Sequence, residues 1–320
     1  MKKGRGIRMN GLEIRKCLIS EIKKAVVGKE DVILKAIAAI MAGGHILLED
    51  IPGVGKTTLA MAISKTMNLQ YNRMQFTSDV MPSDVIGYSV FNKEKGVFQY
   101  KKGVIMCNLF LADEINRTSS KTQSALLEAM EEGSITIEGS SKPLPEPFTV
   151  IATQNPIGSA GTTLLPDSQL DRFMVRLSMG YPEKRDEIQI LKSKMGGNNP
   201  LNDINQVLSV ENLIAIRDMV NNVFVHDTVF EYIVELVNMT RCNEYIEVGI
   251  SPRGTVALIN MAKSIAYLSG RNYVMPEDVM QIFMEVCKHR IILSSKAKIS
   301  KVTVEQVLNS ILRQLSYAGR

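Results

Sequence analysis

The sequence predicts an α/β fold in which a mainly parallel, five-stranded sheet lies between two layers of helices and is followed by a smaller all-α domain. Three observations predict it. Short apolar runs of strand type occur five times before residue 178, stretches with helical spacing separate them, and the chain after residue 200 shows helical patterns alone. Nearly continuous apolar strands that alternate with helices are typical of a parallel sheet covered on both faces.

The strand-type runs are residues 45–48 (HILL), 71–76 (YNRMQF), 106–112 (MCNLFLA), 148–153 (FTVIAT) and 173–177 (FMVRL). Helical patterns begin at Thr57 and at Ser120. The second has a Ser-x-x-Gln capping box, Ser120 with Gln123, and Gly133 as its end. Two further segments, 87–103 and 133–148, contain short runs of strand type next to turn residues, which predicts hairpins that project from the sheet.

After residue 181 the pattern changes. A helical stretch, KRDEIQILKSK, is followed by the linker GGNNP at residues 196–200. Helices are then expected at 209–223, 226–241, 251–269, 276–292 and 304–315, the last behind a capping box of Thr303 and Gln306. We therefore expect a first domain at 1–197, with a basic N-terminal tail at 1–10, and a helical second domain at 198–320.

Composition narrows the class of protein. The 320 residues suffice for two hydrophobic cores. The net charge is +5, but the first eight residues hold four lysines and arginines and no acid, so the rest carries only +1. This disfavours a nucleic-acid surface. No apolar run approaches the ~18 residues that span a bilayer, so we expect no membrane partner and a soluble, cytoplasmic protein. The widely spaced cysteines and histidines indicate neither disulfides nor zinc.

The stretch LEDIPGVGKTT at residues 48–58 nearly fits the phosphate-binding pattern GxxxxGK[ST], with Asp50 in place of the first glycine. In such a P-loop, backbone N–H groups wrap the phosphates, which requires the unusual backbone of Gly53 and Gly55. Lys56 would reach the β and γ oxygens and Thr57 would bind Mg²⁺. Asp50 only begins the turn, so we expect its carboxylate to bond its own backbone and to point away from the phosphates.

Polar side chains follow two of the buried strands. Asp113 and Glu114 end the run 106–112, as in a Walker B motif, where Asp113 would hold the metal largely through water and Glu114 would polarise the attacking water. Asn155 follows the run 148–153. It could open an Asn-Pro turn, or, if this strand lies beside the P-loop strand, it could orient that water.

Two arginines complete the candidate site. Arg172 precedes the last strand, and a surface salt bridge with Asp171 or Asp167 is the alternative explanation for it. Arg253 follows Ser251, an expected N-cap, and Pro252, the expected first helical residue. A cation there opposes the helix dipole, which suggests a phosphate as its partner.

These motifs in this order resemble the AAA+ ATPases. The strings LEDIPGVGKT, LFLADEINR, MEEGSITIEG, ATQNP, LPDSQLDRF and SPR are similar to the MoxR family of that superfamily, across nearly the whole chain. The resemblance implies ATP and Mg²⁺ bound between an αβα domain and a helical lid, and homo-oligomeric rings, commonly hexamers. It implies hairpins facing the ring pore and chaperone-like action on client proteins, some with von Willebrand factor A domains or metal centres.

The resemblance also implies roles for individual residues. Asn155 would be sensor 1, Arg172 an arginine finger that acts on a neighbouring subunit, and Arg253 sensor 2. Arg117 could also lie at the subunit interface. Arg176 is a rival finger, although its place in the strand-type run FMVRL favours a structural role. The expected nucleotide contacts are Val26, Val27 and Gly28 for adenine, and Pro52, Gly53, Val54, Gly55, Lys56, Thr57 and Thr58 for the phosphates.

The leading interpretation is therefore an ATP hydrolase that remodels partner proteins. Two alternatives stay open: a scaffold that binds ATP without hydrolysing it, and a AAA+ motor acting on nucleic acid. A GTPase is disfavoured because no guanine-reading NKxD is present; NKEK at residues 92–95 ends in lysine.

Overall fold

The computed structural model describes residues 9–155, 165–195 and 199–318. Its centre is a five-stranded, all-parallel sheet in the order β2-β5-β8-β1-β9, which confirms the predicted sheet. The strands are β1 (Ile46–Glu49), β2 (Tyr71–Gln75), β5 (Leu109–Asp113), β8 (Thr149–Gln154) and β9 (Val175–Leu177). Because all five run the same way, the polar residues that follow β1, β5 and β8 meet at one edge.

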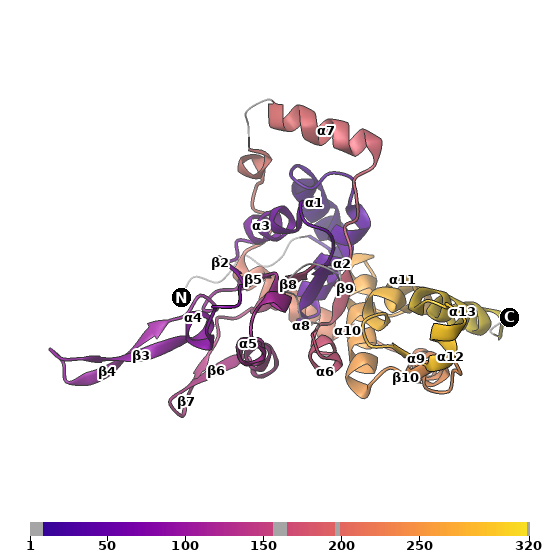
Figure 1. Cartoon of the computed structure of the whole chain (residues 1–320). Coiled ribbons are helices and arrows are strands. Elements are labelled where there is room, and N and C mark those ends of the chain that lie inside the picture. Colours follow the sequence, from indigo (N-terminus) through magenta and orange to yellow (C-terminus); the bar gives the residue numbers. More distant parts are fainter. Residues whose placement is uncertain (1–8, 156–164, 196–198, 319–320) are drawn as a thin grey trace.

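Both faces of the sheet are buried, as the apolar runs predict. Side chains alternate between two hydrophobic clusters: Ile46 and Leu48 of β1 belong to one, and Leu47 belongs to the other. Helices α1 (Gly11–Lys23), α2 (Glu30–Met41) and α3 (Lys56–Thr66) cover the first face. Helices α4 (Pro82–Ile86) and α5 (Ser120–Glu132) cover the second, and Figure 1 shows α3 and α5 on opposite sides of the sheet.

Helix α5 begins as predicted, but its cap is different. Ser119, not Ser120, is the N-cap, and its hydroxyl accepts a hydrogen bond from the Thr122 backbone N–H. The Gln123 amide instead donates to the carbonyl oxygens of Ile115 and Thr118. The expected capping box is therefore wrong, because Gln123 is buried and turns inward to bind the short helix η1 (Ile115–Arg117) and the residue after it. Gly133 ends α5 with a φ of 61°, as predicted.

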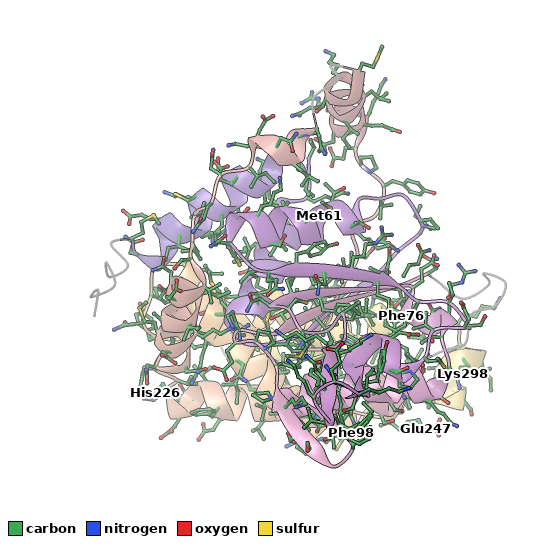
Figure 2. The ribbon with its side chains drawn as sticks, turned by 90° about the vertical axis from the view of Figure 1, so that its left-hand side faces the viewer. Met61, Phe76, Phe98, His226, Glu247 and Lys298 are labelled. Carbon is green, nitrogen blue, oxygen red and sulfur yellow. The ribbon has the colours of Figure 1, made fainter. Side chains whose placement is uncertain are left out.

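Both predicted hairpins are present. They are formed by β3 (Gly87–Asn92) with β4 (Val97–Lys102), and by β6 (Ser134–Ile137) with β7 (Ser140–Pro143). They project on the same side of the molecule (Figure 1), and Figure 2 shows Phe98 of the first hairpin in front of the body. Phe98 is 68% exposed and packs edge-on against Phe91 across the hairpin.

The C-terminal part is mainly helical, as predicted. It contains η2 (Pro200–Asp203), α8 (Val210–Asn221), α9 (Asp227–Arg241), α10 (Pro252–Leu268), α11 (Pro276–Cys287), α12 (Ser295–Ile299) and α13 (Val304–Ala318). Thr303 and Gln306 cap α13 reciprocally. One expected helix is shorter: α11 ends at Cys287, because the chain then forms β11 (Ile292–Leu293), which pairs with β10 (Ile246–Val248). Among the described residues, no helix is long and apolar enough to cross a membrane.

Two connections join the C-terminal helices to the sheet. The hydrophobic cluster on the first face continues from α1 and α2 into α8, α10 and α11. The Asp171 carboxylate, from the loop between α6 (Asp167–Leu170) and β9, accepts hydrogen bonds from the hydroxyl of Ser251 and from Nε of Arg290, at 2.9 and 2.7 Å. Helix α7 (Lys184–Met195) stands apart at the top of Figure 1 and is largely exposed. The boundary expected at 197/198 follows α7 and stays a prediction.

Candidate nucleotide-binding site

The P-loop lies between β1 and α3, at the C-terminal edge of the sheet. Gly53 and Gly55 have φ angles of 88° and 99°, a region that side chains with a Cβ rarely adopt. Gly55 is also the N-cap of α3, so the helix begins at Lys56, one residue before the expected start. A helix N-terminus behind a left-handed turn directs several backbone N–H groups toward one point, which is a site suited to an anion.

Lys56 is a buried cation at the base of this loop. It is 8% exposed, and its ammonium donates to the Asp50 carbonyl oxygen at 2.7 Å and to Asn155 Oδ1 at 3.3 Å. Burial lowers the pKa of Lys56, and the nearby carboxylates of Asp50, Asp113 and Glu114 oppose that shift. A buried ammonium that has lost its hydration is stabilised by an anion such as a phosphate, so Lys56 is suited to bind the β and γ phosphate oxygens, as predicted from the motif.

The Asp50 carboxylate points away from the P-loop, but not toward its own backbone as expected. It accepts hydrogen bonds from Ser178 Oγ at 2.9 Å, from the Met179 backbone N–H, and from the Gly180 backbone N–H at 3.1 Å. The side chain is almost fully buried. Asp50, which replaces the motif's first glycine, therefore binds residues 178–180. These residues lie between β9 and α7, so the bonds hold that segment at the base of the P-loop.

We predict that Asp50→Gly changes ATP affinity by no more than a few-fold, because the carboxylate does not face the phosphates. The variant leaves the buried Met179 N–H and the half-buried Gly180 N–H without a partner, so we expect the free energy of unfolding to fall by about 2 to 4 kcal/mol. Nucleotide titration and urea denaturation measure the two quantities, with Asp50→Asn as the matched control that keeps an acceptor. A large gain in ATP affinity would contradict this placement.

Asp113 and Glu114 lie where β5 ends, as predicted, and Thr153 of β8 positions both. The Thr153 hydroxyl donates to Asp113 Oδ1 at 2.6 Å and accepts from the Glu114 backbone N–H at 2.9 Å. Arg73 of β2 binds the other oxygen of Asp113 at 2.7 Å. Sequence reasoning missed Thr153 and Arg73. Thr153 is the last residue of a recognised apolar run, whereas nothing near Arg73 in sequence indicates its partner.

Asn155 forms hydrogen bonds with both Lys56 and Glu114. Its Nδ2 donates to Glu114 Oε1 at 2.9 Å, while its Oδ1 accepts from Lys56. Since β8 is the neighbour of β1 in the sheet, the structure brings Asn155 to the P-loop as expected. Glu114 also binds Arg117 through Oε2 at 2.7 Å, and this bond, ahead of smaller contributions from Asn155 and Gln75, lowers the pKa of Glu114. Glu114 is thus held ionised and can accept a proton or orient water.

Arg117→Ala should shift the acidic limb of the pH–rate profile for ATP turnover to higher pH. Removing the guanidinium raises the pKa of Glu114 toward its ordinary value, and Glu114 can act as a base only when ionised. The rate at neutral pH should change little through this effect. Turnover measured from pH 4 to pH 8, with Arg117→Lys as the control, gives the answer. An unshifted acidic limb would mean that Arg117 does not tune Glu114 during turnover.

The donors at this edge fit Mg²⁺ bound together with a nucleotide. Within the part of the chain that the structure describes, no group of three or more His, Cys, Asp and Glu side chains could hold a metal alone. Mg²⁺, however, usually takes one or two protein carboxylates and completes its octahedron with phosphate oxygens and water. Asp113 and the Thr57 hydroxyl in the first turn of α3 are the candidate protein donors.

The adenine contacts predicted at Val26 to Gly28 lie in the loop between α1 and α2. Val26 is buried in the core, whereas Val27 is half-buried and Gly28 is exposed. The next residue, Lys29, donates from Nζ to the Tyr181 carbonyl oxygen at 2.8 Å. Residues 178–181 thus touch both this loop and the base of the P-loop. The role in adenine binding stays a prediction.

Arg172 and Arg253 lie at the other edge of the sheet. The residue before β1, His45, accepts from the Val150 N–H through Nδ1 and donates through Nε2 to the Met130 carbonyl oxygen at 3.0 Å. Burial lowers the pKa of His45 to about 4, so this neutral form persists. The last turn of α5 therefore lies beside the start of β1. The P-loop follows the other end of β1, and a strand of four residues is roughly 13 Å long.

Both arginines bind Glu131 in that last turn of α5. Arg172 Nη1 lies 2.9 Å from one carboxylate oxygen, and Arg253 binds the other. Arg172 is thus paired with neither Asp171 nor Asp167, the partners that the alternative reading gave it. Ser251 caps α10 and Pro252 starts it, as predicted. The helix of Arg253 begins at the edge of the sheet opposite its own P-loop, and the phosphate contact of Arg253 as sensor 2 stays a prediction.

The rival finger, Arg176, makes contacts within its own chain. It lies within β9, and its Nη1 pairs with Glu49 Oε2 at 2.9 Å. A second nitrogen approaches the Lys288 carbonyl oxygen at 3.5 Å. Arg176 therefore connects β1 to the C-terminal helices, which fits the structural role that the apolar context of FMVRL suggests.

Known proteins share both parts of this architecture. The family model for the "ATPase family associated with various cellular activities (AAA)" matches residues 45–175, and that for the "AAA lid domain" matches residues 238–311. The uncharacterised protein YeaC of Bacillus subtilis is 44% identical over 294 residues, 92% of each chain. Chaperone MoxR1 of Mycobacterium tuberculosis is 36% identical over 307 residues, 93% of this chain and 81% of that protein.

A crystal structure of an ATPase candidate from Cytophaga hutchinsonii has the same fold. It is 38% identical in sequence, aligns with a TM-score of 0.86, and the alignment covers 95% of both chains. The two family models thus cover the sheet domain with its P-loop and most of the helical lid, and the similarity to known proteins extends over nearly the full length of the chain. The chain belongs to the MoxR family of AAA+ ATPases.

Proposed function

We propose that this protein hydrolyses MgATP at the interfaces of a homo-oligomeric ring and uses the energy to remodel or mature partner proteins in the cytoplasm. One observation carries the proposal: the groups that suit phosphate binding and water activation lie at one edge of the sheet, and the arginine pair lies at the other. A subunit cannot bring its own Arg172 to its own P-loop without unfolding the sheet. A neighbour in a head-to-tail ring can supply it.

In the proposed reaction, the P-loop N–H groups and Lys56 bind the phosphates. Thr57 and Asp113 would hold Mg²⁺, which would neutralise charge on the phosphates. Glu114 accepts a hydrogen bond from the attacking water and Asn155 orients that water. Arg172 of the adjacent subunit stabilises charge on the transferring phosphoryl group. We propose that Arg253 also acts on the nucleotide of an adjacent subunit, because it binds the same carboxylate, Glu131, as Arg172. The family resemblance supports six subunits.

The projecting hairpins support a role for the ring in gripping a client. Val97 and Phe98 at the end of the first hairpin are 53% and 68% exposed. A lone two-stranded hairpin with exposed apolar side chains is marginal in water and gains stability from a partner. The chaperone name of the MoxR1 relative supports a protein client, and the near-neutral body does not favour nucleic acid. We propose a client with a von Willebrand factor A domain on the family resemblance alone.

A mixture of two inactive variants tests the shared site. Lys56→Ala subunits keep both arginines but lack a working P-loop, and Arg172→Ala subunits keep the P-loop but lack the finger. Each variant alone should turn over ATP at a small fraction of the wild-type rate. Mixing them should restore turnover, because a Lys56→Ala subunit can complete the site of an Arg172→Ala neighbour. If the mixture were no more active than the sum of its components, the site would not be shared.

A further inference from the structure

Glu131 holds together two arginines that come from different domains. Its Oε2 lies 2.9 Å from Arg172 Nη1, and its Oε1 binds Arg253 Nη2. Arg172 stands just before β9 in the sheet domain, whereas Arg253 is in the first turn of α10 in the lid. A single carboxylate therefore fixes the spacing of two guanidinium groups that would otherwise repel each other.

The position of Glu131 is costly unless the arginines are there. It lies in the last turn of α5, where the helix dipole disfavours an acid, and that turn contains no basic residue. Glu128, three residues earlier on the same face of the helix, adds like-charge repulsion. The three paired side chains are 30–44% exposed, and ion pairs that exposed contribute little to folding stability. Stability alone is thus a weak reason for this arrangement.

Hydrogen bonds between the two domains hold the backbone next to both arginines in place. The adjacent Asp171 binds the N-cap of α10, Ser251, and also Arg290. Arg172 Nη1 donates in addition to the Leu127 carbonyl oxygen at 2.7 Å. Its Nε is buried and makes no hydrogen bond to the described residues. A cavity of about 300 Å³ lies against this guanidinium, between α5 and Gln169. Arg172 is therefore oriented through Nη1 and keeps one donor, Nε, that no described residue satisfies.

We infer that Glu131 is a positioning residue that holds Arg172 and Arg253 side by side for the phosphates of the nucleotide in a neighbouring subunit. The inference rests on the proposed shared site. An exposed arginine side chain samples many rotamers. The entropy lost when it is fixed in one of them lowers the rate at which the guanidinium reaches the neighbouring phosphates. Because Arg253 belongs to the lid, the bridge also makes the finger's position depend on the orientation of its own subunit's lid.

The experiment adds Glu131→Gln to one component of the mixture at a time. In the Lys56→Ala component, which donates the arginines, the substitution should lower restored turnover about tenfold, the scale of one charge-assisted hydrogen bond. In the Arg172→Ala component, which supplies only the P-loop, it should leave turnover unchanged. ATP affinity should be the same in both arrangements. Glu132→Gln is the matched control, because Glu132 lies in the same turn and forms no ion pair with any described residue.

Each other outcome overturns a distinct statement. An equal loss whichever component carries Glu131→Gln would identify a folding or assembly defect, and thermal unfolding of the single variant would show it. No loss in either component, or a gain in the arginine donor, would refute positioning by Glu131 while leaving the shared site intact. If the mixture without Glu131→Gln already lacked activity, the shared site would fail, and this inference with it.

Discussion

Replacing Arg172 with alanine is expected to slow ATP turnover by the assembled protein by about 10³- to 10⁵-fold, the range measured for arginines supplied in trans to phosphoryl transfer. The loss should appear in kcat, because the guanidinium stabilises charge that develops only in the transition state. ATP affinity should change little, since the P-loop of the same subunit, with Lys56 and Gly55, lies at the opposite edge of the sheet.

Two further variants separate this role from a structural one. Arg172→Lys keeps the positive charge but loses the planar fork of donors, so it should recover only part of the rate. Arg185→Ala removes an exposed arginine of α7 and should leave turnover unchanged. Full activity of Arg172→Ala in the assembled protein would remove Arg172 from the mechanism and would return Arg176 and Arg117 to consideration.

The second large effect is expected for Glu114→Gln, which should lower turnover by about 10³-fold or more while retaining ATP binding. Glutamine keeps the shape of the side chain and can still accept from Asn155 Nδ2, so the P-loop should not be disturbed. It cannot take a proton from water. The measurements are steady-state ATP turnover and nucleotide affinity of the same preparation.

This variant also decides between hydrolysis and a scaffold that only binds ATP. If wild-type protein turned over ATP and Glu114→Gln did so at the same rate, Glu114 would not be the base. If the wild type bound ATP without turnover under every condition of assembly and client, the scaffold reading would stand. Glu114→Gln loaded with ATP would also serve to capture client proteins, because it should hold the assembled state.

The sequence predicts well whatever depends on local pattern. The five strands, the P-loop and the acids after β5 are readable because period, glycine spacing and strand ends are local properties. The position of Asn155 beside Lys56 also follows, since a parallel sheet gathers its strand ends at one edge. Helices α1 and α2, in contrast, were not predicted, because no functional motif lies in them. A capping box at Asn10 does start α1.

Long-range contacts that do not follow from neighbouring strand ends could not be predicted. Asp50 fastens residues 178–180, which lie 128–130 positions away in sequence, and a single sequence holds no record of that pairing. Arg253 has a recognisable place at a helix start, but which edge of the sheet the lid helix meets depends on how α10 packs against α1 and α2. Glu131 looks like one more acid at the end of a charged helix until its two partners are placed beside it.

The central claim is that one active site needs two subunits, and turnover per subunit as a function of protein concentration tests it most directly. Across the range where the oligomer forms, measured in parallel by light scattering, specific ATPase activity should rise from nearly zero to a plateau. The rise should coincide with assembly. Specific activity that stays constant down to concentrations at which only monomer is present would contradict the account.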